Sequence, residues 1–111
     1  MAIIKTIPSK RIINGNIIET SEVSIVSEKE YTTNGEACIL TRGVAESAIT
    51  LDAKNTDHIV IKAMTKTLVK PKVGRIDDEY DEIFLDVYSC VEFKNIGGVW
   101  YILSSDGLKQ S

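Results

Sequence analysis

Short apolar runs alternate along the chain with polar or glycine-containing turn signals. The first run, Ala2 to Ile7, ends at Pro8-Ser9. Asn14-Gly15 then separates two Ile-Ile pairs, at positions 12–13 and 17–18. Asn-Gly between apolar runs favours a type I′ turn, because both central residues of that turn need a positive φ. The pattern therefore predicts strands joined by hairpins from the N-terminus onward.

The clearest strands are predicted in the second half of the chain. His58 to Met64 is strongly apolar, and the next run ends at Pro71, which cannot donate a ladder hydrogen bond. Three further runs occupy positions 83–87, 89–94 and 99–103. Gly97-Gly98 supplies the positive φ that a hairpin between the last two runs requires. We expect helical turns in two places only, at 44–47 and at 77–81 within the polar connection 72–82.

Composition supports the same fold class. Ile, Val and Thr together make up 34 of the 111 residues, whereas Ala and Leu make up 12. β-branched side chains suit a pleated sheet better than a helix. We therefore expect one all-β domain over residues 1–111, a single-domain β-sandwich that is jelly-roll-like or Ig-like. Residues 1–20 are expected to form an extended docking arm or a hairpin.

The run 99–103 differs from the other predicted strands because both of its faces are apolar. Val99, Tyr101 and Leu103 share one face, and Trp100 and Ile102 share the other. Such a strand is covered on both sides within its own fold, or it is covered by another chain. Trp100 and Tyr101 are therefore candidate protein-contact residues, with burial in the core as the alternative.

The charge distribution narrows the range of partners. The formal net charge is −3, which gives no basic excess for neutralising phosphates. No apolar run approaches the roughly 20 residues of a membrane helix, and the N-terminus lacks the features of a signal peptide. We expect neither nucleic acid nor membrane as a direct partner.

A basic segment is followed directly by an acidic one. The basic residues are Lys62, Lys66, Lys70, Lys72 and Arg75, and the acidic residues are Asp77, Asp78, Glu79, Asp81, Glu82 and Asp86. One interpretation is charge pairing between like subunits, with Lys62, Lys66, Arg75, Asp77 and Asp78 as contacts. The alternative is a solvated basic strand face beside a solvated acidic loop.

Residues that carry catalytic or metal chemistry are sparse. Cys38 and Cys90 each lie in a predicted strand, where buried thiols act as small hydrophobes, and a disulfide requires the two strands to be neighbours. His58 is the only histidine, and the acidic run 77–82 lacks the central glycine of an EF-hand loop, which leaves an irregular cation site as the alternative. We expect a protein that is not an enzyme and that holds no cofactor.

The C-terminal half resembles a family of virus proteins. The stretch Val73–Ile83 and the ending Gly98-Val99-Trp100-Tyr101-Ile102-Leu103-Ser104-Ser105-Asp106-Gly107 are similar to small head-associated (auxiliary or decoration) structural proteins of tailed bacteriophages, of the crAss-like and related podovirus groups. The resemblance covers roughly residues 48–109. Residues 1–47 carry no such resemblance.

The resemblance implies a virion structural protein that binds the outside of a phage capsid and stabilises the head. Its partners would be the major capsid protein, copies of itself or other virion proteins, and it would be assembled into virions in the cytoplasm of a bacterial host. Ile3 and Ile4 are candidate contacts, because an Ile-rich N-terminal segment can add a strand to a neighbour's sheet edge. The alternatives are a tail or connector component and a carbohydrate-binding β-sandwich module.

Overall fold

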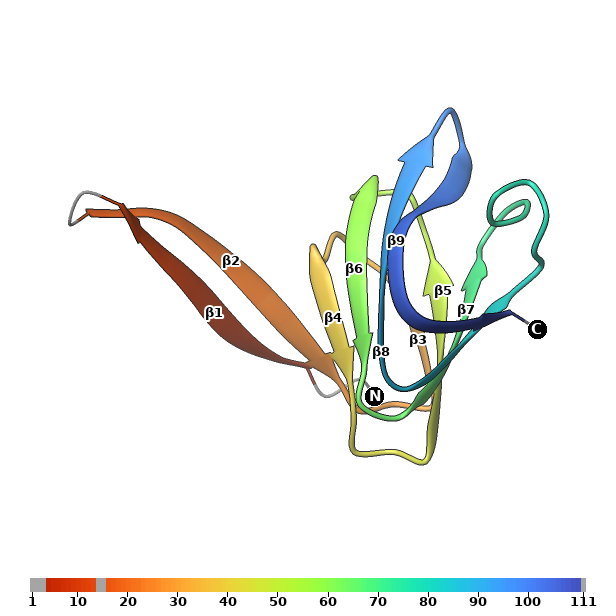
Figure 1. Cartoon of the computed structure of the whole chain (residues 1–111), viewed down its shortest axis with the longest axis horizontal. Helices are drawn as coiled ribbons and strands as arrows, with labels where there is room; N and C mark the ends of the chain where they lie inside the picture. The colour runs from red at the N-terminus through yellow and green to blue at the C-terminus, as the bar shows by residue number, and fades with distance from the viewer. Residues whose placement is uncertain (1–3, 14–15, 111) are drawn as a thin grey trace.

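A computed structural model describes the backbone of residues 4–13 and 16–110 and the side chains of residues 23–106. The domain is all-β (Figure 1), as the composition predicts, and the described residues contain no helix. A helix long and apolar enough to cross a membrane is therefore absent from the described residues. The strands are β1 (Ile4–Ile13), β2 (Asn16–Val26), β3 (Glu30–Thr32), β4 (Cys38–Thr41), β5 (Glu46–Leu51), β6 (His58–Ala63), β7 (Lys66–Pro71), β8 (Ile83–Ile96) and β9 (Val99–Gln110).

Strands β2 to β7 form two stacks of parallel strands. β2, β4 and β6 pair in parallel in the first stack, and β3, β5 and β7 pair in parallel in the second stack. The chain passes to the other stack at every connection, so each strand lies beside the strand two places later in the sequence. Figure 1 shows β4 and β6 on one side of the domain and β5 and β7 on the other.

The long hairpin of β8 and β9 joins the two stacks. The first part of β8, Ile83 to Leu85, pairs antiparallel with β7, and its later part, Cys90 to Lys94, pairs antiparallel with β6. Between these parts the strand bends at Tyr88, which has a φ of 74°. β9 pairs with β8 on both sides of the bend. Every other strand of the two stacks thus connects, directly or through its neighbours, to one bent strand.

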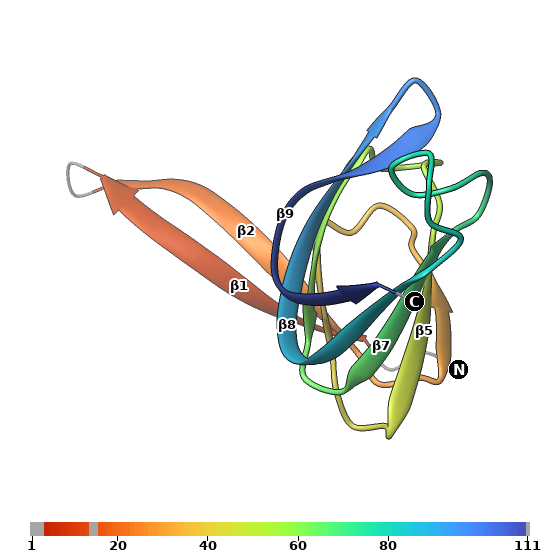
Figure 2. The ribbon, with the colours of Figure 1, turned by 45° about the vertical axis from the view of Figure 1, so that its right-hand side comes forward.

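The N-terminal hairpin, β1 and β2, leaves the body as an arm. The two strands pair antiparallel from Ile4↔Val26 to Ile13↔Asn16, as the Asn14-Gly15 signal predicts, although that dipeptide lies outside the described residues. Only Ser24 to Val26 also pair with β4. Figures 1 and 2 show the arm pointing away from the side of the body that β5 and β7 occupy.

The core lies between the two stacks. In β5, β6 and β7, alternate residues point inward, and the inward side chains are mostly aliphatic, with Ser47 and Thr67 as polar exceptions. One buried polar link crosses this core, where the Thr41 and Thr67 hydroxyls lie 2.7 Å apart. The largest fully buried side chain is Phe93 on β8, and the others include Ile39, Ile49, Leu51, Ile59, Ile61, Ile76, Ile83 and Leu85.

The strand connections differ from both sandwich types expected from the sequence. Jelly-roll and Ig-like sandwiches are built from antiparallel sheets, whereas β2 to β7 pair in parallel. The physical reason lies in the connections. Each one carries the chain to the opposite stack, so a strand returns to its own stack in the same direction as before and pairs there in parallel. Gly35, at a φ of 92°, does mark a turn, but that turn joins β3 and β4, which belong to different stacks.

The two expected helical turns are also wrong. Residues 43–45 form a bend and β5 begins at Glu46. Asp77 and Asp78 adopt φ values of 56° and 55°, and the Glu79 amide donates to the Ile76 carbonyl at 3.0 Å. Two consecutive left-handed residues closed by such a bond make a type I′ turn, for which aspartate is among the tolerant residue types.

Candidate functional site

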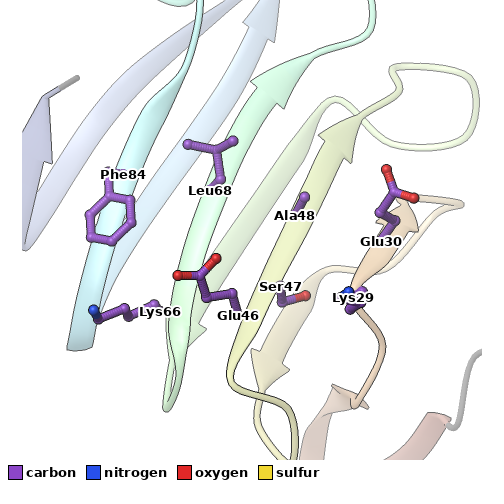
Figure 3. A pocket seen from close by; sticks show the side chains of 8 residues that line it. All are labelled: Lys29, Glu30, Glu46, Ser47, Ala48, Lys66, Leu68 and Phe84. Carbon is purple, nitrogen blue, oxygen red and sulfur yellow. The ribbon is translucent and has the colours of Figure 1, made fainter.

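A shallow groove of about 320 Å³ lies on the outer face of the second stack. Figure 3 shows its floor, a row of outward side chains that crosses three strands: Ala48 on β5, Leu68 on β7 and Phe84 on β8. The register explains the row, because Ala48 is paired with Leu68 and Leu68 with Phe84. All three side chains are partly buried. The second stack therefore presents an apolar strip on a face that is otherwise polar.

Charged side chains surround this strip. Glu46 and Lys66 are register partners on β5 and β7, and Lys29 and Glu30 stand at the β3 end (Figure 3). All four residues are exposed. None of them forms an ion pair or a side-chain hydrogen bond with another residue among those that the structure describes. The rim therefore offers two anions and two cations to an incoming partner.

The groove continues toward the connection between β6 and β7. A second hollow shares Lys29, Glu46 and Lys66 with the first and adds Met64 and Val87. Met64 is 39% exposed and Val87 is 37% exposed. Exposed apolar side chains that adjoin an apolar strip extend the area that a protein partner can bury.

The outer face of the first stack is built differently, because its charges are paired. His58 Nε2 lies 2.5 Å from Glu92 Oε2, and Ser104 Oγ donates to Glu92 Oε1 at 3.0 Å. Lys94 Nζ donates to Asp57 Oδ2 at 3.0 Å. These hydrogen bonds lower the pKa of Glu92, through His58 and then Ser104, and the pKa of Asp57, through Lys94.

The order of groups around Glu92 does not make a catalytic triad. In a triad the histidine lies between the nucleophile and the acid, so that it can take the proton of the hydroxyl. Here the carboxylate lies between Ser104 and His58. The carboxylate therefore holds both groups as a surface network.

The two cysteines also lie on the first stack and are not neighbours. Cys38 is on β4 and Cys90 on β8, with β6 between them. Both are free thiols and partly buried, and burial raises the pKa of Cys38, with a further contribution from Cys90. The possibility of a disulfide between neighbouring strands does not hold, because a disulfide requires Cα atoms within about 7 Å and two strand spacings exceed that.

Trp100 lies in the core and not at the surface. It is 2% exposed and belongs to the main hydrophobic cluster. The connection 72–82 covers it, because Ile76 is fully buried and forms a bridge with Trp100, while the Asp77 amide donates to the Trp100 carbonyl at 2.9 Å. Of the two interpretations of this residue, the core interpretation is correct. The prediction that Trp100 contacts another protein is wrong, because its side chain is not accessible at the surface.

The acidic part of the connection folds back onto β9. Asp77 Oδ1 accepts a hydrogen bond from the Ile102 amide at 2.9 Å, and Asp78 Oδ2 accepts one from the Tyr101 hydroxyl at 3.3 Å. The negative charges of Asp78 and Asp77 raise the pKa of Tyr101. Within the side chains described, residues 23–106, no three His, Cys, Asp or Glu residues are grouped as metal ligands.

The remaining predicted contact residues are dispersed. Lys62 lies on the outer face of the first stack, where its Nζ donates to the Tyr88 carbonyl at 2.7 Å, while Lys66 lies on the second stack. Arg75 bonds Asp81 within the connection at 3.1 Å. Ile4 pairs with Val26 at the base of the arm, and Ile3 lies outside the described residues. From the predicted set, the structure therefore brings together Asp77, Asp78, Trp100 and Tyr101 where the connection lies on β9, and it separates the others.

The groove was missed by the sequence analysis, although a signal for it exists. In β7 the outward positions are Lys66, Leu68 and Lys70, so one apolar residue stands between two lysines. Phe84 occupies the corresponding outward position of β8. These alternations show a partly apolar outer face, but the residues come into one row only through the pairing of β7 with β5 and with β8.

Comparison with known proteins adds no assignment. Neither the protein-family models nor the curated proteins contain a match to this chain. The resemblance to head-associated phage proteins therefore stays a prediction from the sequence.

Proposed function

We propose that this chain is a structural protein of a tailed-phage virion, an auxiliary protein that binds other virion proteins on the outside of the head and stabilises it. The observation that carries this proposal is the arm. A two-stranded hairpin is marginally stable in water without a third strand or a covering surface. From Asn16 to Val23, β2 pairs only with β1 in the part of the chain that the structure describes. Such a hairpin is suited to become ordered against a neighbouring protein.

The second support is the groove on the second stack. Its partly buried apolar floor and its four rim charges, which have no side-chain partner among the described residues, resemble the anatomy of protein interfaces, in which an apolar centre lies within a polar rim. Many copies on a regular lattice raise the effective concentration of each contact, so individually weak contacts are sufficient.

A carbohydrate-binding role is less well supported by the aromatic side chains. Trp100 is buried, Tyr101 bonds Asp78, and Tyr31 bonds Glu36. Tyr88, 66% exposed, stands at the bend of β8. Glycan recognition by stacking generally uses flat rings gathered on one face, and the described aromatic residues do not provide such a group. A tail or connector position uses the same protein-binding chemistry, and locating the labelled chain on particles by electron microscopy distinguishes it from a head position.

The test is the composition and stability of virus particles. We expect quantitative mass spectrometry of purified particles to find the chain in many copies, and we expect particles that lack it to lose packaged DNA at a lower temperature. Its absence from purified particles contradicts the proposal. So does an arm variant, Ile12→Thr with Ile17→Thr, that keeps the melting temperature of the domain and is incorporated as well as the wild type.

A further inference from the structure

The first part of β9 forms a free edge of the sheet. Among residues 4–13 and 16–110, β9 pairs with β8 alone, so its other side has no partner strand. Val99 to Ile102 pair with β8 without interruption, and a register shift follows. From Val99 to Ser105 the chain contains no charged residue and no proline. A β-prone, uncharged segment along an open edge is a site at which another chain can add a strand.

The other two edge strands of the described sheet are protected by their own sequence. β3 has only three residues, and β1 contains Lys5, Pro8 and Lys10. Short edge strands, lysine and proline all oppose pairing with a further strand, and proline has no amide hydrogen to donate. The first part of β9 has none of these features, so its protection has to come from another part of the chain.

The connection 72–82 occupies this edge and begins there as a strand. Ile76 forms a parallel bridge with Trp100, and the Asp77 amide donates to the Trp100 carbonyl at 2.9 Å. The Ile76 side chain is fully buried in the same core cluster as Trp100, so it anchors the connection to the edge. The hydrogen bond that an added strand would make with the Trp100 carbonyl is therefore already made within the chain.

Asp77 ends this pairing after a single bridge. In a regular parallel pair, the amide two residues after Trp100, which is that of Ile102, would donate to the main-chain carbonyl of Asp77. Here the Ile102 amide donates to the Asp77 carboxylate instead, at 2.9 Å from Oδ1. The main chain leaves the edge at the same point, because Asp77 and Asp78 adopt left-handed φ values of 56° and 55°. The carboxylate therefore satisfies the next amide of the edge while the backbone turns away from it.

We propose that the connection 72–82 is an edge guard, with Ile76 as its anchor and Asp77 as its stop, that prevents β9 from pairing with the β9 edge of a second copy. A second copy is the partner to be excluded, because two identical edges can pair antiparallel about a twofold axis, with the same uncharged run on both sides of the contact. The guard serves this purpose whether or not the chain belongs to a virion. It leaves the outer faces of the two stacks free for other contacts.

Three substitutions that each remove one negative charge test the guard. Asp77→Gly removes the carboxylate but allows a left-handed φ. Asp77→Asn keeps an oxygen that can accept the hydrogen bond of the Ile102 amide, and asparagine also tolerates this φ. Asp78→Gly is the matched control, because Asp78 has the same backbone conformation but its carboxylate accepts from the Tyr101 hydroxyl and not from the edge amide.

We expect the guard of Asp77→Gly to open about tenfold more often, because one hydrogen bond that holds it is lost. Since the guards of both copies have to open, the dissociation constant of the dimer should fall by about a hundredfold. Analytical ultracentrifugation should therefore find stronger self-association for Asp77→Gly than for the wild type, Asp77→Asn and Asp78→Gly. Equal self-association of all four chains, or of the two variants at position 77, overturns the proposal.

A further substitution identifies the surface that associates. Lysine on an edge strand opposes pairing, so Asp77→Gly combined with Tyr101→Lys should associate no more strongly than the wild type. Association that persists in this double variant uses a different surface and overturns the proposal.

Hydrogen exchange of the wild type covers the case in which the variants fail to fold. The Ile102 amide, which faces away from β8 toward the connection, should be protected as strongly as the amides that pair β9 with β8. An Ile102 amide that exchanges as fast as an exposed amide shows that Asp77 does not hold the edge, and it overturns the proposal.

Discussion

The two stacks share one core, but the polar side chains on their outer faces differ in whether they are hydrogen-bonded to one another. On the first stack, Glu92 bonds both His58 and Ser104, Lys94 bonds Asp57, and Lys62 bonds a backbone carbonyl. On the second stack, the four rim residues of the groove have no such partners among the described residues, and the apolar floor is partly exposed.

The difference indicates which face binds a partner. Groups that already bond one another must give up those bonds before they bind anything else, so the first stack has little to gain from a contact. When a partner binds the second stack, the rim charges form new hydrogen bonds and the partly exposed apolar side chains of the floor become buried. The functional face is therefore expected to contribute less to the stability of the isolated domain than the core does.

Two phenylalanines on β8 test this comparison with the largest expected effect. Phe93 is fully buried in the core, whereas Phe84 lies in the floor of the groove. Phe93→Ala should lower the free energy of unfolding by about 3–5 kcal/mol, and Phe84→Ala by about 1 kcal/mol. Chemical denaturation of the purified domain measures both values. Equal losses would mean that the groove is part of the structural core and would remove the contrast between the faces.

The polar link across the core gives a smaller, directional effect. Thr67 Oγ1 donates to the Thr65 carbonyl at 2.9 Å, so its other neighbour, the Thr41 hydroxyl, must donate to Thr67. Thr67→Val leaves the buried Thr41 hydroxyl without its acceptor and should cost about 1–3 kcal/mol. Thr41→Val leaves Thr67 its bond to Thr65 and should cost less. Thermal unfolding of the two variants tests the order, and a larger loss for Thr41→Val would contradict this direction of hydrogen bonding.

The paired face should show the smallest effect, as a dependence on pH. The pKa of Glu92 lies below its ordinary value, so the folded state takes up this proton less readily than the unfolded state. The stabilisation is therefore complete above the ordinary glutamate pKa, and it disappears as the pH falls through the lowered pKa of the folded state. The stability difference between the wild type and Glu92→Gln should shrink between about pH 6 and about pH 3. Denaturation curves that stay equally far apart over this range would show that the network adds no pH-dependent stability.

The fold class and the two glycine-marked hairpins were predictable because their signals are local. β-branched composition indicates strands, Asn14-Gly15 lies between paired strands, and Gly97 and Gly98 both adopt a positive φ in the turn between β8 and β9. The parallel stacking was not predictable in this way. A turn signal such as Asn34-Gly35 shows where a strand ends, but it does not show whether the next strand returns to the same sheet or crosses to the opposite one.

The surroundings of the predicted contact residues could not be predicted from the sequence for the same reason. Trp100 and Ile102 give β9 an apolar face, but the cover comes from Ile76, which lies in a stretch that is polar around it. The basic segment divides between the two stacks because β6 and β7 belong to different stacks. Alternation along one strand tells which residues share a face, and the neighbours on that face depend on pairings between strands that are distant in the sequence.

The bent strand β8 has a consequence for how the molecule forms. Both stacks end on it, so neither is complete until residues 83–96 have been synthesised. Contacts between residues far apart in sequence slow folding, because the chain loses the entropy of loop closure before the contact stabilises it. The emerging chain therefore exposes the edges of β6 and β7 until its last quarter appears. We expect truncation before residue 83 to give aggregation in place of a smaller folded unit.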